Sequence, residues 1–285
     1  MNSTSVSEIV TAALKEDLGT DLSLSNDISS QLLPENYEKV AVVFTRELGV
    51  FCGKEFVDEV FRQLGNGVEI SWYVKDGDLI HPGQKLMKAS GRARVIMAAD
   101  RTVVNFMQTL SGVATTTSHY AKAIEGTSCR LIDTRKTVPG IREALKYAVS
   151  CGGGECGRTN LYDSFLIKHS HIEACGGIEA AVKQARSLAD SKSIKIEVSE
   201  LYELDEALAS GADTILLDNF DVLSIKKAVE KNNHRAKIEV SGNVTLETIR
   251  TFAAAGADYI SVGAITKNIR TLDMSMRFEC EEDEE

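Results

Sequence analysis

The sequence predicts an α/β protein whose larger part is a barrel of alternating strands and helices. From about residue 131 onward, short apolar runs recur roughly every twenty to thirty residues, which leaves room for one helix between consecutive strands. Repeated units of this kind imply parallel strands, either in a closed α/β barrel or in an open, doubly wound sheet. A polar or charged side chain lies at the end of nearly every run. We favour the barrel because its strand ends converge on one mouth, whereas an open sheet gathers only those beside its switch point.

Six apolar runs are the expected strands of this barrel. They span residues 131–135, 165–168, 194–198, 214–218, 236–241 and 259–263. Five of the runs carry a polar or charged residue at or next to their ends, namely Arg135, Lys168, Glu197, Asp218 and Ser241. These side chains are therefore expected to share one site at the mouth of the barrel.

The stretches between the runs place apolar residues at helical spacing, as in residues 201–210 and 245–255. Each of these two stretches is followed by Gly-Ala-Asp, beginning at Gly211 and Gly256. Glycine is favoured directly after a helix because it readily adopts the left-handed backbone conformation found there. Each expected helix therefore ends just before the next strand begins.

The first 110 residues have a different pattern, which predicts a separate α+β portion. Short β-like runs alternate there with helical stretches, and a turn-rich segment is expected to form a β-hairpin. The β-like runs are residues 39–45, 70–74 and 85–89, the helical stretches are 6–17 and 52–64, and the turn-rich segment is 74–86.

Composition limits the class of protein. With 285 residues, of which 43% are hydrophobic and 26% charged, the chain can bury a substantial core. The sequence has no apolar run of membrane-spanning length, and its N-terminus lacks the features of a signal peptide, so we expect a cytoplasmic protein without a membrane partner. The net charge of −10 comes largely from an acidic tail at residues 279–285, which is expected to be solvated. This balance argues against a nucleic-acid partner, which would require a basic face.

The six cysteines are scattered, and none falls into a Cys-x-x-Cys pair or a Cys/His zinc spacing. We interpret them as reduced, mostly buried thiols. Because Cys151 and Cys156 flank a glycine-rich segment, a thiol close to a site remains an alternative.

The densest group of candidate binding residues follows the first expected strand. Five cations occur within 24 residues around glycines that would bring backbone N–H groups close to a ligand. Phosphates and carboxylates are the natural ligands of such a group. The cations are Arg135, Lys136, Arg142, Lys146 and Arg158, followed by Lys168.

Glycines also follow the last two expected strands, in Ser241-Gly242-Asn243 and Gly263-Ala264. Loops at these positions of α/β barrels frequently hold a phosphate through backbone amides. A phosphate site is therefore expected here, and the alternative is that the glycines only end the strands.

The acidic residues Glu197 and Asp218 each lie at the end of a strand. In a mouth lined by cations they could bind Mg²⁺ together with a phosphorylated substrate, or stabilise positive charge that develops at an anomeric carbon. The alternative is a salt bridge to Lys136 or Lys168.

Taken together, these motifs resemble the quinolinate phosphoribosyltransferase family over essentially the whole chain. The matching segments are Asp133-Thr134-Arg135-Lys136-Thr137, Lys146-Tyr147-Ala148-Val149, Gly152-Gly153-Gly154, Leu166-Ile167-Lys168, Leu217-Asp218-Asn219, Ser241-Gly242-Asn243 and Val262-Gly263-Ala264, with Lys15-Glu16-Asp17-Leu18 and Arg101-Thr102 nearer the N-terminus.

This resemblance implies an N-terminal α+β sandwich domain at 1–112, joined by residues 271–285, and an incomplete TIM-type barrel of about seven strands at 113–270. It implies a carboxylating nicotinate-nucleotide diphosphorylase that joins quinolinate to phosphoribosyl pyrophosphate and releases carbon dioxide and pyrophosphate. It also implies Mg²⁺, no organic cofactor, and a homodimer or higher oligomer in which Arg101 enters the neighbouring subunit's site.

The resemblance further implies a role for each matching residue. Lys136, Glu197 and Asp218 would be catalytic, with Glu197 and Asp218 also near the metal, which can be held through the substrate. Substrate binding would involve Arg101, Thr134, Arg135, Arg158, Lys168, Ser241, Gly242, Asn243, Gly263 and Ala264.

The sequence departs from the family pattern where a histidine is usual, because Cys156-Gly157-Arg158 stands in place of Asn-His-Arg. Only the central acid, Glu197, is kept in a strand that often carries three. These departures leave open a related phosphoribosyltransferase that acts on a different base or acid, such as the molybdenum-associated type, and a non-catalytic sensor of phosphoribosyl pyrophosphate or a nucleotide. A barrel aldolase with Lys136 or Lys168 as a Schiff-base amine is a further alternative.

Overall fold

The computed structural model describes residues 3–65 and 67–279 and divides into two compact units. The first unit is formed by the residues up to 116, by 138–153 and by those from 268 on, and the second by 117–137 and 154–267. None of the helices in the described part of the chain is long and apolar enough to cross a bilayer.

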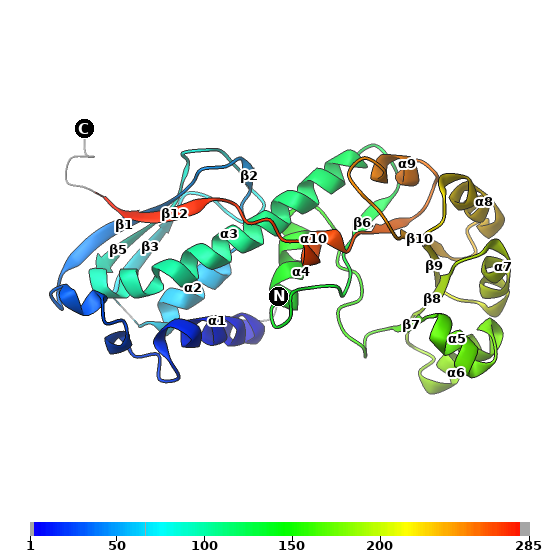
Figure 1. Ribbon diagram of the computed structural model, residues 1–285, viewed down its shortest axis with the longest axis horizontal. Helices are drawn as coiled ribbons and strands as arrows, with labels where there is room; N and C mark the ends of the chain where they lie inside the picture. Colours follow the sequence, from blue (N-terminus) through cyan, green and yellow to red (C-terminus); the bar gives the residue numbers. More distant parts are fainter. Residues whose placement is uncertain (1–2, 66, 280–285) are drawn as a thin grey trace. The chain divides into compact units, whose positions relative to one another are not determined.

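The first unit contains a four-stranded antiparallel sheet in the order β12-β1-β5-β3 (Figure 1). Strand β12 pairs with β1, with Ala41 opposite Phe278, so β12 is an edge strand of this sheet. The four strands are β12 (Met274–Phe278), β1 (Glu38–Thr45), β5 (Lys85–Arg92) and β3 (Val68–Trp72).

The helices of the first unit bury apolar residues at helical spacing. In α2 (Lys54–Gln63) the buried side chains are Phe56, Val57, Val60 and Phe61, and this helix packs against α1 (Ser3–Leu18). The other helical elements are α3 (Ala93–Ala123), which runs on past residue 116, α4 (Arg142–Cys151), and two short 3-10 turns at Leu24–Asn26 and Ser30–Leu32.

The turn-rich segment after β3 is more complex than the expected hairpin. Strands β3 and β5 do pair, with Trp72 opposite Met87. Between them, however, the chain forms the short strand β4 (Leu79–Ile80), which pairs with β2 (Gly49–Val50) in a separate two-stranded sheet.

The second unit contains a parallel sheet of six strands in the order β6-β11-β10-β9-β8-β7. From β7 to β11 each strand pairs with the next in sequence, and β11 returns to pair with β6, which is the topology of a barrel. The strands are β6 (Arg130–Ile132), β7 (Phe165–Ile167), β8 (Ile194–Val198), β9 (Thr214–Asp218), β10 (Lys237–Ser241) and β11 (Tyr259–Ser261).

The barrel is incomplete, and it has six strands where the sequence resemblance implied about seven. No strand pairing joins β6 to β7 among the described residues. Between these two strands in sequence, Glu155 makes a single parallel bridge to Ile132. The bridge lies beside β6, where a seventh strand would stand. It stays a single bridge because the residues after Glu155 form no further bridges to β6.

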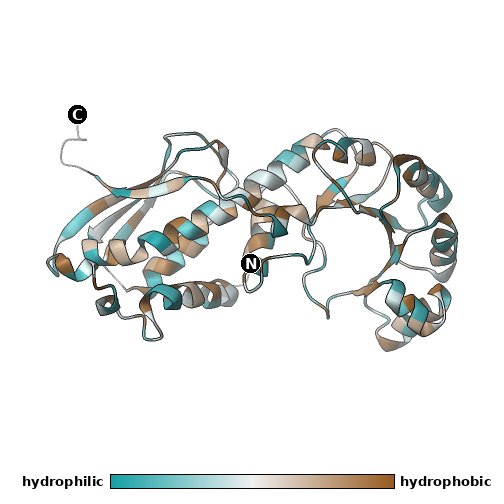
Figure 2. Cartoon of the chain, in the orientation of Figure 1, coloured by the Kyte–Doolittle hydropathy of each residue, from teal (hydrophilic) through white to brown (hydrophobic). Residues whose placement is uncertain are grey.

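Helices follow the strands, and α5 to α8 lie along the outside of this sheet (Figure 1). In Figure 2 the hydrophilic residues of α7 and α8 lie mainly on the side turned away from the strands. The helices are α5 (His169–Cys175), α6 (Ile178–Leu188), α7 (Leu201–Ser210), α8 (Val222–Asn232), α9 (Ile249–Ala253) and α10 (Ala264–Lys267). Helix α7 ends at Gly211, which has the left-handed conformation expected from the Gly-Ala-Asp motif, with a φ of 76°.

Alternation along the strands turns polar side chains toward the inside of the barrel. In β8, Ile194, Ile196 and Val198 are buried, whereas Lys195 and Glu197 line a pocket. Successive side chains of a strand point to opposite faces, so the apolar set packs under the helices and the polar set faces inward. The same alternation turns Asp218 of β9 and Ser241 of β10 toward the pocket.

Candidate functional site

A pocket of about 730 Å³ lies in the second unit and reaches from the carboxyl ends of the strands to residues of β7 and α6. Its lining includes the residue after β7, the last residues of β9 and β10, and the loop after β6, so the barrel brings together segments far apart in sequence. The sequence-predicted residues that line it are Thr134, Arg135, Lys136, Arg158, Lys168, Glu197, Asp218 and Ser241.

The loop after β6 is held in place by its own polar groups. Strand β6 ends at Ile132, two residues before Thr134, so Arg135 and Lys136 lie on this loop and not in a strand. The backbone N–H of Lys136 donates to Thr134 Oγ1 at 3.1 Å, and Thr266 Oγ1 donates to the Lys136 carbonyl at 2.8 Å. These bonds fix the backbone from which the two cationic side chains enter the pocket.

Two arginines lie close together with unused hydrogen-bonding capacity. The Nε atoms of Arg135 and Arg158 are buried and make no hydrogen bond to any residue in the described part of the chain. Burial, reinforced by the nearby charge of Arg135, lowers the pKa of Arg158. Asp163 offsets this only in part, with its Oδ1 at 3.6 Å from Arg158 Nε. Since buried charged donors are costly without acceptors, this side of the pocket is built for a planar anion.

The strands β8 and β9 contribute a second, acidic side to the pocket, the carboxylates of Glu197 and Asp218. Burial raises the pKa of Glu197, and the negative charge of Asp218 adds to this effect, while Lys168 and Lys136 act in the other direction. Within the described residues, no ion pair or side-chain hydrogen bond holds either carboxylate. The alternative of a salt bridge to Lys136 or Lys168 is thus not realised in this structure.

The loop after β10 lies close to the loop after β9. Asn219 N–H donates to the Ser241 carbonyl at 2.9 Å, and Asn243 Nδ2 donates to Asn219 Oδ1 at 3.1 Å. Gly242 has a φ of 98°, and a Cβ there would meet Asn219 Oδ1 at 2.2 Å. Only glycine fits at this position.

The second glycine loop lies against the cationic loop. A Cβ on Gly263 would meet Lys136 Cδ at 3.2 Å and Thr134 Oγ1 at 3.3 Å. Ala264 begins α10 directly afterwards. Of the residues expected from the two glycine motifs, Ser241 lines the pocket, whereas Gly242, Asn243, Gly263 and Ala264 are its immediate neighbours in sequence or in space.

Sequence reasoning did not single out an ion pair on the inner wall of the pocket. Lys195 of β8 bonds to Glu239 of β10, and the Glu239 side chain is only 3% exposed. Both residues line the pocket. Each lies two positions before a predicted site residue, Glu197 or Ser241, and the two-residue period of a strand could have placed them on the same face.

Histidine 171 also lines the pocket, and its Nδ1 accepts a hydrogen bond from the backbone N–H of Lys168 at 3.0 Å. The imidazole thereby caps the start of α5. Arg101, by contrast, lies on α3 in the first unit with an exposed side chain.

The unusual Gly157 is packed against the end of β6. Its backbone N–H donates to Asp133 Oδ1 at 2.7 Å, and a Cβ at this position would meet the Asp133 carbonyl oxygen at 2.8 Å. A histidine here would therefore require the segment before Arg158 to move away from Asp133.

Two family descriptions match nearly the whole chain. Quinolinate phosphoribosyl transferase, N-terminal domain, matches residues 27–111, and the corresponding C-terminal domain matches residues 113–277. The chain is 35% identical to a probable carboxylating nicotinate-nucleotide pyrophosphorylase of Bacillus subtilis, covering 97% of this chain and 94% of the relative. It is 37% identical to the chloroplastic carboxylating enzyme of Arabidopsis thaliana, covering 95% and 83%.

Solved structures agree with these sequence matches. The nicotinate-nucleotide pyrophosphorylase from Francisella tularensis superimposes with a TM-score of 0.93 at 40% identity, covering 98% of each chain. The corresponding protein from Ehrlichia chaffeensis gives a TM-score of 0.90 at 37% identity, covering 96% of this chain and 98% of that one.

Proposed function

The chain belongs to the quinolinate phosphoribosyltransferase family, and we propose that its pocket transfers the phosphoribosyl group of phosphoribosyl pyrophosphate to quinolinate. The products are nicotinate mononucleotide, carbon dioxide and pyrophosphate. The observation that carries this proposal is that one pocket holds Arg135 and Arg158, whose buried Nε atoms lack acceptors among the described residues, together with the carboxylates of Glu197 and Asp218. The arginines suit a planar dicarboxylate, and the carboxylates suit an anomeric carbon on which positive charge develops.

Arg158 and Arg135 are the proposed grip on the dicarboxylate. A guanidinium presents parallel N–H donors that match a carboxylate, whereas a lysine offers a point charge. Bringing an anion to this side relieves the mutual repulsion of the two arginines and supplies their unused Nε donors with acceptors. Lys168 would add a further positive charge at the pocket wall.

Phosphoribosyl pyrophosphate would occupy the remaining mouth. Ser241, Gly242, Asn243, Gly263 and Ala264 would hold the 5-phosphate, because these loops bring backbone close to the mouth without intervening side chains. The Lys136 side chain, which lies against Gly263 and beside Thr134, would neutralise charge on the departing pyrophosphate.

The bond-forming step follows from this placement. The pyridine nitrogen attacks the anomeric carbon as the bond to pyrophosphate breaks, and positive charge develops on the ribose ring. Glu197 and Asp218 stabilise that charge more in the transition state than in the ground state, which is the condition for faster chemistry.

Decarboxylation would follow nucleotide formation. The ring nitrogen is then a positively charged pyridinium, so the electron pair left on the adjacent ring carbon by departing carbon dioxide is stabilised. A proton then replaces the lost carboxylate. No organic cofactor is required for this step.

The residues present fit a Mg²⁺ ion that would arrive with the substrate. Glu197 and Asp218 offer oxygen ligands, and no hydrogen bond to a described side chain occupies either carboxylate. When bound, Mg²⁺ would neutralise the pyrophosphate and improve it as a leaving group.

We also propose a homodimer in which Arg101 of one subunit completes the pocket of the other. The support is the exposed side chain of Arg101 and its place within the part of the chain that matches the family's N-terminal domain. A mixture of Arg101→Ala and Glu197→Gln subunits tests this arrangement, since each variant alone lacks one part of every site. Random exchange should restore about a quarter of the wild-type activity through hybrid dimers with one intact site; no recovery after confirmed exchange would contradict the shared site.

One observation favours a second candidate function, a related phosphoribosyltransferase with a different acid or base. Gly157 leaves no side chain where the family usually has histidine, and its close approach to Asp133 fixes the backbone before Arg158. Such an enzyme would keep the phosphoribosyl machinery and change only the grip on the ring.

The deciding experiment is an assay of the purified protein with quinolinate, phosphoribosyl pyrophosphate and Mg²⁺, with nicotinate as a parallel substrate. Formation of nicotinate mononucleotide and pyrophosphate from quinolinate alone supports the first proposal. Turnover of neither substrate, with phosphoribosyl pyrophosphate still bound, supports the second candidate or a sensor. Borohydride trapping with carbonyl compounds tests the aldolase alternative at Lys136 and Lys168.

A further inference from the structure

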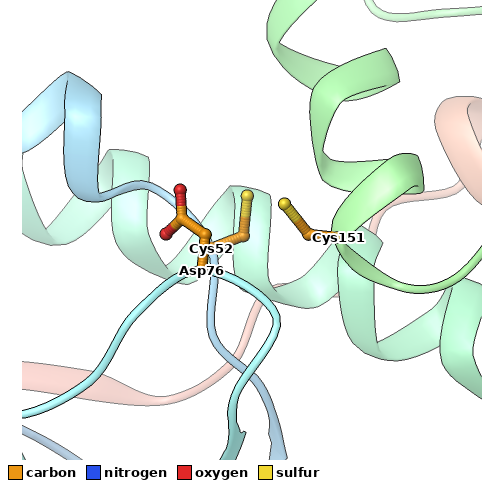
Figure 3. A group of neighbouring side chains, drawn as sticks. All are labelled: Cys52, Asp76 and Cys151. Carbon is orange, nitrogen blue, oxygen red and sulfur yellow. The ribbon is translucent and has the colours of Figure 1, made fainter.

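Two cysteine thiols face one another in the first unit, among residues that the proposed reaction does not use. Cys52 lies just before α2, and Cys151 is the last residue of α4 (Figure 3). Their Sγ atoms and a carboxylate oxygen of Asp76 all lie within 4.8 Å of one another. The Cys52 side chain is fully buried, while Cys151 is partly exposed and can be reached from solvent.

Asp76 holds the two cysteine-bearing segments together. Its Oδ1 accepts hydrogen bonds from the N–H groups of Gly53 at 2.9 Å and Lys54 at 3.1 Å, at the start of α2. Its Oδ2 accepts from the Tyr147 hydroxyl at 2.6 Å, one helical turn before Cys151. The carboxylate therefore clamps the residue after Cys52 and the turn before Cys151, which keeps the thiols adjacent.

The same hydrogen bonds argue against a metal ion at this place. The two carboxylate oxygens of Asp76 together accept three hydrogen bonds. A cation would have to displace the Tyr147 hydroxyl or the N–H groups that begin α2. Two neighbouring thiols without a free third ligand are better suited to covalent chemistry with each other.

The two thiols differ in reactivity. Hydrogen bonding from Cys52 lowers the pKa of Cys151, whereas burial raises the pKa of Cys52 well above its usual value. Cys151 is thus the accessible sulfur that ionises first, and Cys52 is the protected sulfur behind it. This is the arrangement of an attacking and a resolving cysteine.

We propose that Cys52 and Cys151 form a reversible dithiol–disulfide pair that is closed by peroxides. The Cys151 thiolate attacks one oxygen of hydrogen peroxide, the O–O bond breaks, and Cys151 becomes a sulfenic acid as hydroxide leaves. The proton that Cys151 lost on ionising converts this hydroxide to the first water. Cys52 sulfur then attacks the Cys151 sulfur, the S–O bond breaks, and the leaving hydroxide takes the Cys52 proton as a second water. Two thiols and one peroxide thus give one disulfide and two waters.

Closure brings together two sulfur atoms that already lie within 4.8 Å of one another. In a disulfide they lie about 2.05 Å apart. Both backbone segments are already fixed by Asp76. The disulfide would join the start of α2 to the end of α4 and close a long loop, so it restricts the unfolded chain and raises resistance to urea.

The closed bond would also fix the start of the glycine run. Gly152 N–H donates to the Ala148 carbonyl and Gly153 N–H to that of Ser150, both at 3.1 Å, so the run continues directly from the end of α4. Residues 155–158, which include Arg158, follow a few positions later.

The test uses the full chain with the substitutions C156S, C175S and C280S, which remove competing thiols. We expect hydrogen peroxide to remove two hydrogen atoms from the native protein, with a disulfide-linked pair of peptides containing Cys52 and Cys151, and dithiothreitol to restore both thiols. The urea midpoint of the oxidised form should exceed that of the reduced form.

Matched variants separate the pair from general thiol oxidation. C52S should leave a sulfenic acid on Cys151 that dimedone traps, and C129S, which removes a buried thiol elsewhere, should leave disulfide formation unchanged. Asp76→Asn keeps the size of the clamp and should slow closure by weakening it. In the folded protein, oxidation of Cys151 to sulfinic acid without a Cys52 link would overturn the proposal. So would a zinc ion held by the reduced protein and lost in C151S.

Discussion

The two sides of the pocket are built in different ways. The arginine side rests on loops: Arg135 and Arg158 have buried Nε atoms without hydrogen bonds to the described residues, and one weak contact to Asp163. The acidic side rests on strands: Glu197 and Asp218 are fixed by the parallel ladder, and the Lys195–Glu239 pair lies on the same inner faces. Loops that hold unsatisfied cations suit the capture of a substrate, whereas strands fix groups that must act on one atom.

Breaking the inner ion pair should have the largest effect, because it leaves a buried charge on the rigid side. Lys195→Met leaves Glu239, only 3% exposed, without its partner. We expect a loss of about 3–5 kcal/mol in the free energy of unfolding, measured by urea denaturation.

The double variant Lys195→Met/Glu239→Leu is the control, since it removes both charges. It should recover much of the lost stability. A single variant as stable as the wild type would show that the pair carries no such role and that water reaches Glu239.

Removing one carboxylate from the acidic side should affect turnover more than binding. Glu197→Gln keeps the size of the side chain and removes the charge that we propose stabilises the anomeric carbon. We expect kcat to fall on the order of 100-fold, with little change in either KM. An unchanged kcat would remove Glu197 from the bond-forming step.

On the arginine side the expected effect is on binding. Arg158→Ala should raise the KM for quinolinate by roughly 10- to 100-fold through the loss of a charged, forked contact, and should leave that for phosphoribosyl pyrophosphate nearly unchanged. Arg158→Lys keeps the positive charge but loses the forked guanidinium. Its KM for quinolinate should lie between that of the wild type and that of Arg158→Ala. Equal effects on both KM values would contradict the assignment of Arg158 to the dicarboxylate.

Much of this contrast could be predicted from sequence, and the reasons are physical. Glu197 and Asp218 were expected to share one mouth because each lies at or next to the end of an expected strand, and the pairing of β8 with β9 brings those strands side by side. The mixed α/β fold with a parallel strand sheet was confirmed by the similarity to solved structures. Where glycines such as Gly211 ended helices, the local signal was strong enough to place the boundary.

What sequence could not supply were features that depend on distant contacts. The long helix α3 was missed because its β-branched and small residues, such as Val103, Val104 and Thr115, do not favour a helix strongly on their own. The bridge formed by Glu155 involves one residue, so it leaves no repeating hydrophobic pattern in the sequence. The Lys195–Glu239 and Cys52–Cys151 pairs join segments that only the fold brings together.

The smallest expected effect is the pH dependence that the Glu197 carboxylate gives to catalysis and to stability, and it concerns the acidic side of the pocket alone. The pKa of Glu197 is raised, mainly by burial, so catalysis that needs its ionised form should be lost, as pH falls, at a pH above that of an ordinary glutamate. Stability should respond in the opposite sense. Because the folded pKa exceeds the unfolded one, Glu197 favours folding below its unfolded pKa, and this contribution disappears as pH rises through the folded pKa.

Glu197→Gln therefore should be slightly more stable than the wild type at neutral pH and lose that advantage in acid, as measured by urea midpoints across pH. The reason is that the wild type must hold a desolvated carboxylate beside Asp218 when both are ionised. An advantage of the same size at all pH values would show that the carboxylate does not titrate abnormally. The acidic side would then be solvated like the surface, and its contrast with the arginine side would rest on geometry alone.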